Sequence, residues 1–223
     1  MKLLYFYGRK RGLTLPELLV VIAVLAILAF LLFPLLAAMK RQTNRDNCIE
    51  NLKQVNLSFI IWERDNNKNK YPTQISVTNG GAMELVATGN VAACFSVMSY
   101  ELSTPKILIC PADTSHVWVT NFDGNFNNSH ISYFVSPDVA DETNANMILI
   151  GDDNLAINGV ALNSGIVELS TQFSWTKKRH DHAGNIGYGD GSVAEISDDG
   201  LDEAASLATK SGTNVLINRI AIP

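Results

Sequence analysis

The stretch RGLTLPELLVVIAVLAIL, residues 11–28, places one carboxylate, that of Glu17, at the start of a long apolar run. From Leu18 to Ala38 no charged residue occurs, and Leu, Ile, Val, Ala and Phe fill nearly every position. About 20 such residues cross the hydrocarbon core of a bilayer as a helix. A carboxylate at that depth costs several kcal/mol unless a partner neutralises it. The run therefore predicts a membrane helix in which Glu17 has a specific role.

Charge is distributed unevenly along the chain. Residues 1–12 contain basic side chains and no acidic one, yet the 223-residue chain has a net charge of −5. The body after this leader is therefore acidic, and it shows no basic stripe. Nucleic-acid binding depends on neutralising phosphates, so this composition argues against a nucleic-acid partner.

Two ordinary explanations of the apolar run are incomplete. A cleaved secretory signal has an apolar region of about 7–15 residues and a small-residue cleavage site. Here the run is longer, and LLAAMKR at 35–41 is a poor site. A plain membrane anchor explains the length and the basic flanks, but it gives Glu17 no role.

The segment RKRGLTLPELLVVIAVLAILAFLLFP, residues 9–34, resembles the N-terminus of type IV prepilins and type II secretion pseudopilins. The resemblance implies that a prepilin peptidase cuts between Gly12 and Leu13 and methylates the new amine of Leu13. Glu17 then becomes the fifth residue of the mature chain. In such filaments this glutamate is thought to pair with the N-terminal amine of a neighbouring subunit, which would neutralise it.

Two prolines bear on this helix. Pro16 falls in the first turn of the mature helix, where a missing N–H costs little. Pro34 removes a backbone hydrogen bond to Phe30 and predicts a kink. The resemblance places Pro34 where many pilins carry a kink or a segment that loosens on assembly. Leu13 departs from the family pattern, which usually has Phe at that position.

The helix is expected to continue beyond the membrane. Cys48, Leu52, Val55, Phe59 and Trp62 recur at spacings of three and four, the pattern of one apolar helix face. The Asn-rich segment before Pro72 ends it, which predicts a helix over about 14–64. The segment at 47–72, NCIENLKQVNLSFIIWERDNNKNKYP, also resembles pseudopilin-like proteins.

The remaining residues predict an α+β head of short elements. Residues 80–102 are expected to hold one or two short helices. Strands are expected at 106–111, 131–136, 146–152 and 214–223, a hairpin at 185–196 and a helix at 201–212 closed by Gly212. TPKILICPADTS and RHDHAGNIGYGDGSV resemble a pseudopilin-like branch with Cys-Pro-x-Asp and His…Gly-Asn…Asp-Gly-Ser-Val motifs.

The predicted fold class is therefore α+β and pilin-like, with a long N-terminal helix packed on a small antiparallel-sheet head. Residues 1–12 form the basic leader and 13–38 the transmembrane half of the helix. Residues 39–65 form its amphipathic half, and 66–223 form the head outside the cytoplasmic membrane.

Three cysteines occur, at positions 48, 94 and 110. Disulfides persist outside the cytoplasm, and an odd count leaves one cysteine unpaired. The resemblance favours a Cys48–Cys110 disulfide, because both residues lie in motifs shared with the pseudopilin-like branch. A Cys94–Cys110 disulfide and three buried thiols remain open.

Ion binding and catalysis have only weak signals. SDDGLDE at 197–203 is a dense oxygen cluster that predicts either calcium binding or a capped helix start; its acidic residues are Asp198, Asp199, Asp202 and Glu203. His180 and His182 with Asp190 suggest a metal only if the segment is a strand, and a hydrogen-bonded loop is the simpler interpretation. No HExxH motif, nucleophile elbow or phosphate-binding loop occurs, so no enzymatic activity is expected.

The sequence thus predicts a structural, filament-forming protein of the bacterial inner membrane, single-pass, with its head in the periplasm or outside the cell. It is expected to be a pseudopilin-like subunit of a type II secretion or related machine that needs no cofactor. Its expected partners are prepilin peptidase, other pilin-like subunits and an inner-membrane assembly platform. The alternatives are a type IV pilus subunit and, from another class, a membrane-tethered enzyme or binding module.

Overall fold

The computed structural model describes residues 12, 14–66, 68–169, 173–209 and 218–223, without the side chain of Ala37. The chain divides into two compact units, Met1–Gln42 and Thr43–Pro223. Each unit is described by itself below.

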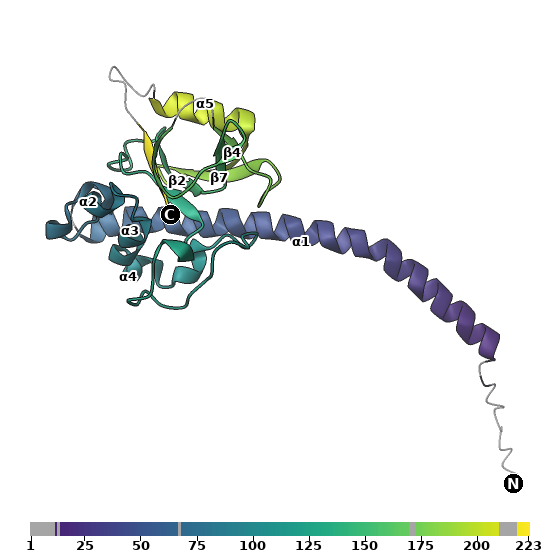
Figure 1. Cartoon of the computed structure of the whole chain (residues 1–223). Helices are drawn as coiled ribbons and strands as arrows, with labels where there is room; N and C mark the ends of the chain where they lie inside the picture. The colour runs from purple at the N-terminus through teal and green to yellow at the C-terminus, as the bar shows by residue number, and fades with distance from the viewer. Residues whose placement is uncertain (1–11, 13, 67, 170–172, 210–217) are drawn as a thin grey trace, which may run out of the picture. The chain divides into compact units, whose positions relative to one another are not determined.

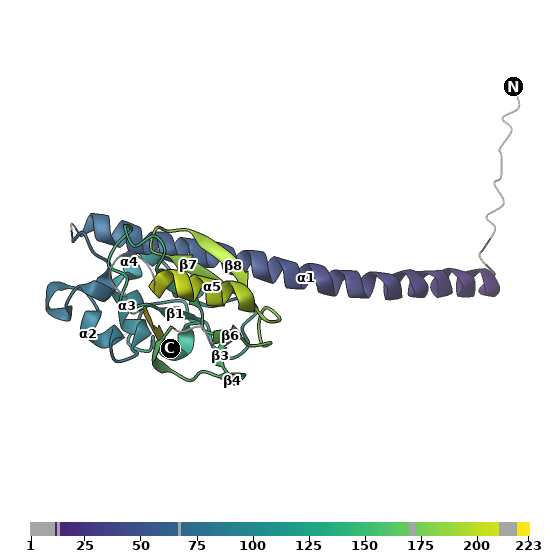
Figure 2. The same cartoon turned by 90° about the horizontal axis from the view of Figure 1, so that it is seen from above.

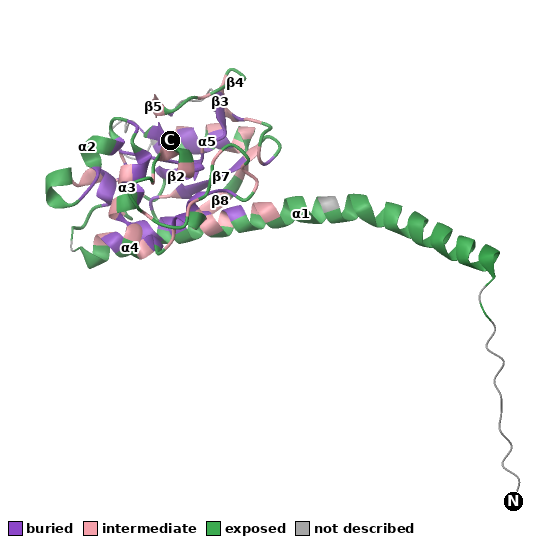
Figure 3. Ribbon diagram, turned by 60° about the horizontal axis from the view of Figure 1, so that its bottom comes forward, coloured by how far each residue is buried: buried purple, intermediate pink, exposed green. Residues whose placement is uncertain are grey.

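One helix, α1 (Leu15–Asp65), runs through 51 residues and confirms the helix predicted over 14–64. Within the second unit, its apolar face is buried as the spacing predicts. Cys48, Leu52, Val55 and Phe59 are fully buried, and Trp62 is 3% exposed. Leu57 on the other side of the helix is 53% exposed, so this part of α1 is amphipathic. In Figure 3, α1 is exposed along its N-terminal part and carries buried residues in the part that belongs to the second unit.

The second unit is built on a six-stranded antiparallel sheet in the order β5-β9-β1-β2-β7-β8. Its strands are β1 (Tyr133–Val135), β2 (Ile148–Asp152), β5 (Gly165–Glu168), β7 (Ala183–Tyr188), β8 (Val193–Ser197) and β9 (Arg219–Ile222). Figure 1 labels two of these strands, β2 and β7. A three-stranded sheet, ordered β4-β3-β6, contains β3 (Leu155–Ile157), β4 (Val160–Ala161) and β6 (Phe173–Trp175).

The central strands β1 and β2 of the large sheet are buried on both faces. On one face, Tyr133 and Val135 join the apolar face of α1 in a first core. On the other face, Phe134 and Ile148 join a second core with α5 (Asp198–Thr209) and the small sheet. Figure 2 shows α5 and the strands of this unit from above. Successive strand residues point to opposite faces, so a strand that is buried throughout, such as β2, is apolar at nearly every position.

Three short helices complete the first core: α2 (Met83–Val86), α3 (Val91–Val97) and α4 (Ser99–Leu102). They lie in the segment where one or two short helices were expected. Four 3₁₀ turns also occur in the described residues: η1 (Pro72–Gln74), η2 (Val77–Asn79), η3 (Pro105–Leu108) and η4 (Asn128–His130).

The strand predicted at 106–111 is wrong, because η3 occupies this position. Pro105 starts the turn without a backbone N–H, and the hydroxyl of Thr104 accepts the N–H of Lys106 at 3.4 Å. These two residues favour a turn over a strand. The strands expected at 131–136 and 146–152 and the hairpin at 185–196 are confirmed by β1, β2 and the β7–β8 pair.

The C-terminal predictions are confirmed with changed bounds. Helix α5 begins at Asp198, three residues before the predicted start. Gly212, its predicted end, lies outside the described residues. The last strand is β9, which occupies only the end of the predicted range.

Candidate functional site

The N-terminal site lies at the start of α1. Thr14 precedes the helix, and its carbonyl accepts the N–H of Leu18 at 3.1 Å. The backbone N–H and the hydroxyl of Thr14 donate to Oε2 of Glu17 at 2.7 and 2.8 Å. A glutamate that reaches back to the N–H of a threonine three residues earlier is one half of a capping box. Glu17 is therefore held at the helix N-terminus by its own chain.

Gly12 is exposed, and Leu13 lies outside the described residues. The predicted cut between them and the methylation of Leu13 stay predictions. Pro34 lies inside α1, as expected from the sequence, and its predicted part in assembly also stays a prediction.

The first unit exposes its apolar side chains. Among the described residues, α1 is the one helix long and apolar enough to cross a membrane, with a mean hydropathy of 3.2 over its most apolar 18 residues. None of that window is buried inside the protein. Phe30 and Phe33 are 80% and 77% exposed. The core helix of a soluble protein would bury such residues, so this part of α1 fits a single-pass inner-membrane anchor.

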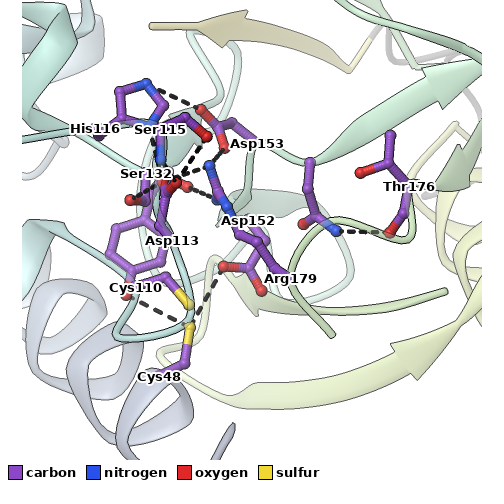
Figure 4. A network of polar contacts seen from close by, with 12 residues as sticks. Cys48, Cys110, Asp113, Ser115, His116, Ser132, Asp152, Asp153, Thr176 and Arg179 are labelled. Atoms are coloured by element: carbon purple, nitrogen blue, oxygen red, sulfur yellow. Dashed lines mark hydrogen bonds and ion pairs between the residues drawn. The ribbon is translucent and has the colours of Figure 1, made fainter. Parts of the chain in front are cut away.

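A second site lies in the interior of the second unit, where four buried side chains from separate segments meet. This Cys–Asp–His cluster consists of Cys48, Cys110, Asp152 and His180. One ligating atom from each residue lies within 4.8 Å of the other three. The thiol Sγ of Cys110 is 3.3 Å from Nε2 of His180, and Sγ of Cys48 donates to Oδ1 of Asp152 at 3.4 Å. Figure 4 shows the two cysteines facing each other beside Asp152.

Each segment places its residue for a local reason. Cys48 starts the apolar face of α1, Cys110 follows η3, and Asp152 ends β2. His180 lies in the loop before β7, where Asp181 and His182 adopt positive φ angles of 55° and 62°. This left-handed backbone turns the chain sharply, and it separates the two histidines. His180 is buried, whereas the side chain of His182 is 59% exposed. The segment RHDH, residues 179–182, is thus a loop rather than a strand.

Further polar contacts hold the cluster in place. The backbone N–H and the side-chain amide of Asn185 donate to Oδ2 of Asp152 at 2.8 and 2.9 Å. Oδ2 is also 3.6 Å from Nε2 of His180. The hydroxyl of Tyr133 lies 3.6 Å from Sγ of Cys48. Arg45 donates from its guanidinium to the carbonyl of His180. The carboxylate and the imidazole are therefore oriented before any ligand binds.

The two thiols of the cluster differ in acidity. The neighbouring thiol of Cys48, with the hydrogen bond from His180, lowers the pKa of Cys110 to about 6 against the opposing effect of burial. The neighbouring thiol of Cys110 and burial both raise the pKa of Cys48. Burial lowers the pKa of His180, but the hydrogen bond with Cys110 and the charge of Asp152 outweigh it, so the net pKa is raised. Cys110 is thus the thiol that ionises more readily.

The geometry does not support nucleophilic catalysis. In a catalytic triad the third residue orients the ring nitrogen opposite the nucleophile. Here Asp152 approaches Nε2, the nitrogen that already faces Cys110. Nδ1 of His180 has no hydrogen-bond partner among the described residues. Cys110 is also fully buried, so no substrate reaches it.

A neighbouring ion-pair network surrounds Arg179, which Figure 4 also shows. Its guanidinium donates to the carbonyl of Ser132 at 2.8 Å and contacts Asp113 at 2.6 Å and also Asp153. His116 lies 2.7 Å from Asp113. A cavity of about 500 Å³ borders this network. Because Arg179 already supplies the positive charge, Asp113, His116 and Asp153 form a structural network rather than a metal site.

The two carboxyls that share Arg179 titrate differently. Burial raises the pKa of Asp113, but the bond to His116 and the charge of Arg179 lower it well below its usual range. Burial raises the pKa of Asp153 to about 6 despite Arg179. One guanidinium cannot fully stabilise two buried carboxylates in their charged forms, and the charged form of Asp153 is the less stabilised of the two.

The predicted calcium ligands do not converge. In the described residues the structure gathers two groups of three or more potential metal ligands, and neither contains the acidic residues of 198–203. Asp198 instead accepts the N–H of Trp175 at 2.6 Å at the start of α5. Calcium binding by Asp198, Asp199, Asp202 and Glu203 stays a prediction.

The three cysteines are buried thiols in the structure. Cys48 and Cys110 are neighbours, whereas Cys94 lies apart from both in α3. The Cys48–Cys110 disulfide stays a prediction. Asp152, Asp113 and Arg179 were not singled out as site residues by the sequence. The available signal was weak: a charged pair closing the apolar run of β2, and an acid two residues after Pro111.

Comparison with known proteins identifies the N-terminal segment. Residues 7–33 match the family described as the prokaryotic N-terminal methylation motif. No curated protein and no solved structure matches the chain significantly. The motif is consistent with the prepilin-type resemblance of residues 9–34, and it indicates a pilin-like substrate of prepilin peptidase.

Proposed function

We propose that this chain is a pseudopilin-like structural subunit of a type II secretion or related filament. The observation that carries the proposal is the combination of the methylation motif at residues 7–33 with a membrane-length helix that is exposed on all sides. The two cores of the second unit contain residues of α1 from Cys48 onward and none from its exposed N-terminal part. The helix is therefore available first to lipid and then to other subunits.

Processing would supply a cationic partner for Glu17. Cutting after Gly12 creates an amine on Leu13, and this amine stays cationic after a single methylation. A carboxylate in a low-dielectric environment strongly prefers such a partner. The hydrogen bonds from Thr14 keep Glu17 at the helix start, where the amine of a neighbouring subunit can reach it. Docking of each new subunit would then set the axial register.

The charge of the leader supports one orientation. Its basic residues, Lys2, Arg9, Lys10 and Arg11, favour the cytoplasmic side of the membrane. The head would then lie in the periplasm or outside the cell, and an inner-membrane platform would receive the helix.

No catalytic role is included in the proposal. The cysteine and histidine that come closest to a nucleophile and base are sealed inside the protein, and the histidine lacks the orienting carboxylate of a triad. The head is proposed to act as a structural module.

The test is the intact mass and N-terminal sequence of the protein extracted from its own membranes. We expect a chain that begins at N-methylated Leu13. Glu17→Val should be processed but should fail to assemble. Glu50→Val, which removes an exposed carboxylate from the same helix, should be processed and should also assemble. A chain that begins at Met1, or one cut near Ala38, would contradict the proposal.

Deletion of the gene distinguishes a subunit of a secretion machine from a type IV pilus subunit. A pseudopilin-like subunit predicts defective release of exoproteins with surface fibres retained. Absent surface fibres with normal secretion would instead identify a type IV pilus subunit.

A further inference from the structure

We propose that the Cys–Asp–His cluster is a structural zinc site that joins α1 to the head sheet. Its members share three properties: they are at least 98% buried, they come from four different segments, and their ligating atoms point at one another. The set comprises Cys48, Cys110, Asp152 and His180.

Two distances within the cluster are close to those of a tetrahedral site. With zinc–sulfur bonds of about 2.3 Å and zinc–nitrogen or zinc–oxygen bonds of about 2.0 Å, tetrahedral ligands lie about 3.8 Å apart for two sulfurs, about 3.5 Å for sulfur and nitrogen or oxygen, and about 3.3 Å for nitrogen and oxygen. The structure has 3.3 Å between Sγ of Cys110 and Nε2 of His180 and 3.4 Å between Sγ of Cys48 and Oδ1 of Asp152. Nε2 of His180 lies 3.6 Å from Oδ2, the other carboxylate oxygen of Asp152. The two sulfurs lie within 4.8 Å of each other.

The donor types select the metal class. Two thiols, one imidazole and one carboxylate suit a borderline-soft ion without geometric demands of its own, which zinc is. Calcium and magnesium prefer sets made only of oxygen atoms. Four protein ligands with no opening to solvent are typical of structural rather than catalytic zinc.

The surroundings of the cluster resemble a prepared ligand shell. Asn185 binds Oδ2 of Asp152 through two N–H groups and so fixes the carboxylate. The hydroxyl of Tyr133 is placed to donate to the sulfur of Cys48. Groups that orient ligands in this way are a general feature of metal sites.

A disulfide would explain only half of the cluster. It would join the two sulfurs and leave a buried imidazole and a buried carboxylate facing an apolar S–S bond. A bound cation satisfies all four groups, and an uncompensated buried carboxylate is costly. The whole arrangement, rather than the sulfur pair alone, therefore points to a metal.

The experiment uses the full-length protein purified from membranes in detergent without chelators. Metal content is measured by mass spectrometry of the elements, and thiol oxidation by the intact mass after alkylation in denaturant. We expect one zinc per chain and three alkylated thiols. Cys110→Ser and His180→Gln should lose the zinc. Cys94→Ser and His116→Gln, which change the same residue types outside the cluster, should keep it.

Cobalt substitution keeps the test independent of variants that fail to fold. Wild-type protein unfolded with reductant and chelator, then refolded with Co²⁺, should show the intense visible bands of tetrahedral cobalt and a thiolate charge-transfer band. His180→Cys should retain the metal and strengthen the charge-transfer band, because a third thiolate replaces the imidazole.

Three results would overturn the proposal. The first is a Cys48–Cys110 disulfide in protein taken directly from membranes. The second is wild-type protein that holds three thiols and no metal after refolding with excess zinc. The third is zinc that every cluster variant retains, since the ion would then bind elsewhere.

Discussion

The side chain of Asn56 on α1 donates to the carbonyl oxygens of both Tyr188 and Ser192, at 3.0 and 3.2 Å, across the turn of the β7–β8 hairpin. Asn56 is fully buried, so this amide ties the amphipathic part of α1 to the hairpin with no competition from water. The contact lies entirely within the second unit.

Replacing Asn56 should therefore destabilise the head. In Asn56→Leu each carbonyl loses its side-chain donor and keeps one backbone donor, the N–H of Gly191 for Tyr188 and that of Tyr188 for Ser192. Losing the two side-chain hydrogen bonds costs about 1–3 kcal/mol. The free energy of unfolding of the full-length protein in detergent, followed by tryptophan fluorescence, should fall by that amount. Gln54→Ala, at an exposed position two residues away, is the control and should leave it within about 0.5 kcal/mol of wild type. Equal stability of both variants would show that the amide contributes nothing.

Gly187 lies where the side chain of Asn56 on α1 packs against the sheet. A Cβ at this position would lie 2.8 Å from Nδ2 of Asn56 and 2.8 Å from Cγ2 of Ile150. Gly187→Ala must therefore displace these two side chains, at a cost of about 1–3 kcal/mol. Denaturant unfolding of Gly187→Ala beside Gly124→Ala, where a Cβ meets no atom within 4 Å, checks this. A loss of stability in both would assign the effect to glycine itself rather than to the close approach.

Asp153 should make the head less stable as the pH rises. Its pKa is about 6 in the folded protein and 3.8 as the ordinary value. Between these values the folded chain keeps a proton that the unfolded chain has released, so stability falls with increasing pH and levels off above about 6. The total is of order 1–3 kcal/mol.

Asp153→Asn should remove this decline, since the amide cannot ionise. Stability curves of wild type and variant between pH 4 and 7 should converge at the acidic end and separate above it. Asp199→Asn, at an exposed position, should follow wild type throughout. Parallel curves for wild type and Asp153→Asn would contradict the prediction.

The hydroxyl of Thr14 should assist assembly without being required for processing. Thr14→Val removes one of the two hydrogen bonds to Glu17 and keeps the backbone N–H. Losing a helix-capping interaction costs about 0.5–2 kcal/mol. The amount of assembled filament, measured by shearing and immunoblotting, should fall less than in Glu17→Val, and Thr14→Ser should restore it. Failure of Thr14→Val to be cut would place the hydroxyl in peptidase recognition instead.

Sequence reasoning succeeded where a pattern is local. The apolar spacing from Cys48 to Trp62 and the hairpin at 185–196 depend on neighbours in the chain, and both predictions are confirmed. The strand prediction at 106–111 failed because it considered only the apolar residues of that segment. Thr104 and Pro105, which precede it, start a turn instead. The small sheet was not predicted, since β4 has only two residues and leaves almost no periodic signal.

The Cys–Asp–His cluster shows the limit of such reasoning. Cys48 and Cys110 stood out as a pair, and His180 stood out with His182, but nothing in the sequence joined the two sets. Asp152 was expected only as the end of the strand at 146–152. Their meeting depends on α1, η3, β2 and the loop before β7 packing together, and no sequence spacing encodes that arrangement.

The N-terminal part of α1, residues 15–36, is exposed around its whole circumference, and this has a consequence for how a subunit would leave the bilayer. Phe30, Phe33 and their neighbours bury little apolar surface against their own chain, so in a single subunit they would be surrounded by lipid tails. In the proposed filament, the helices of neighbouring subunits would cover the apolar surface that lipid tails cover in the single subunit. A single subunit extracted alone would expose this apolar surface to water. We therefore expect each subunit to leave the bilayer only at the end of a growing filament, where the apolar helices of earlier subunits cover it.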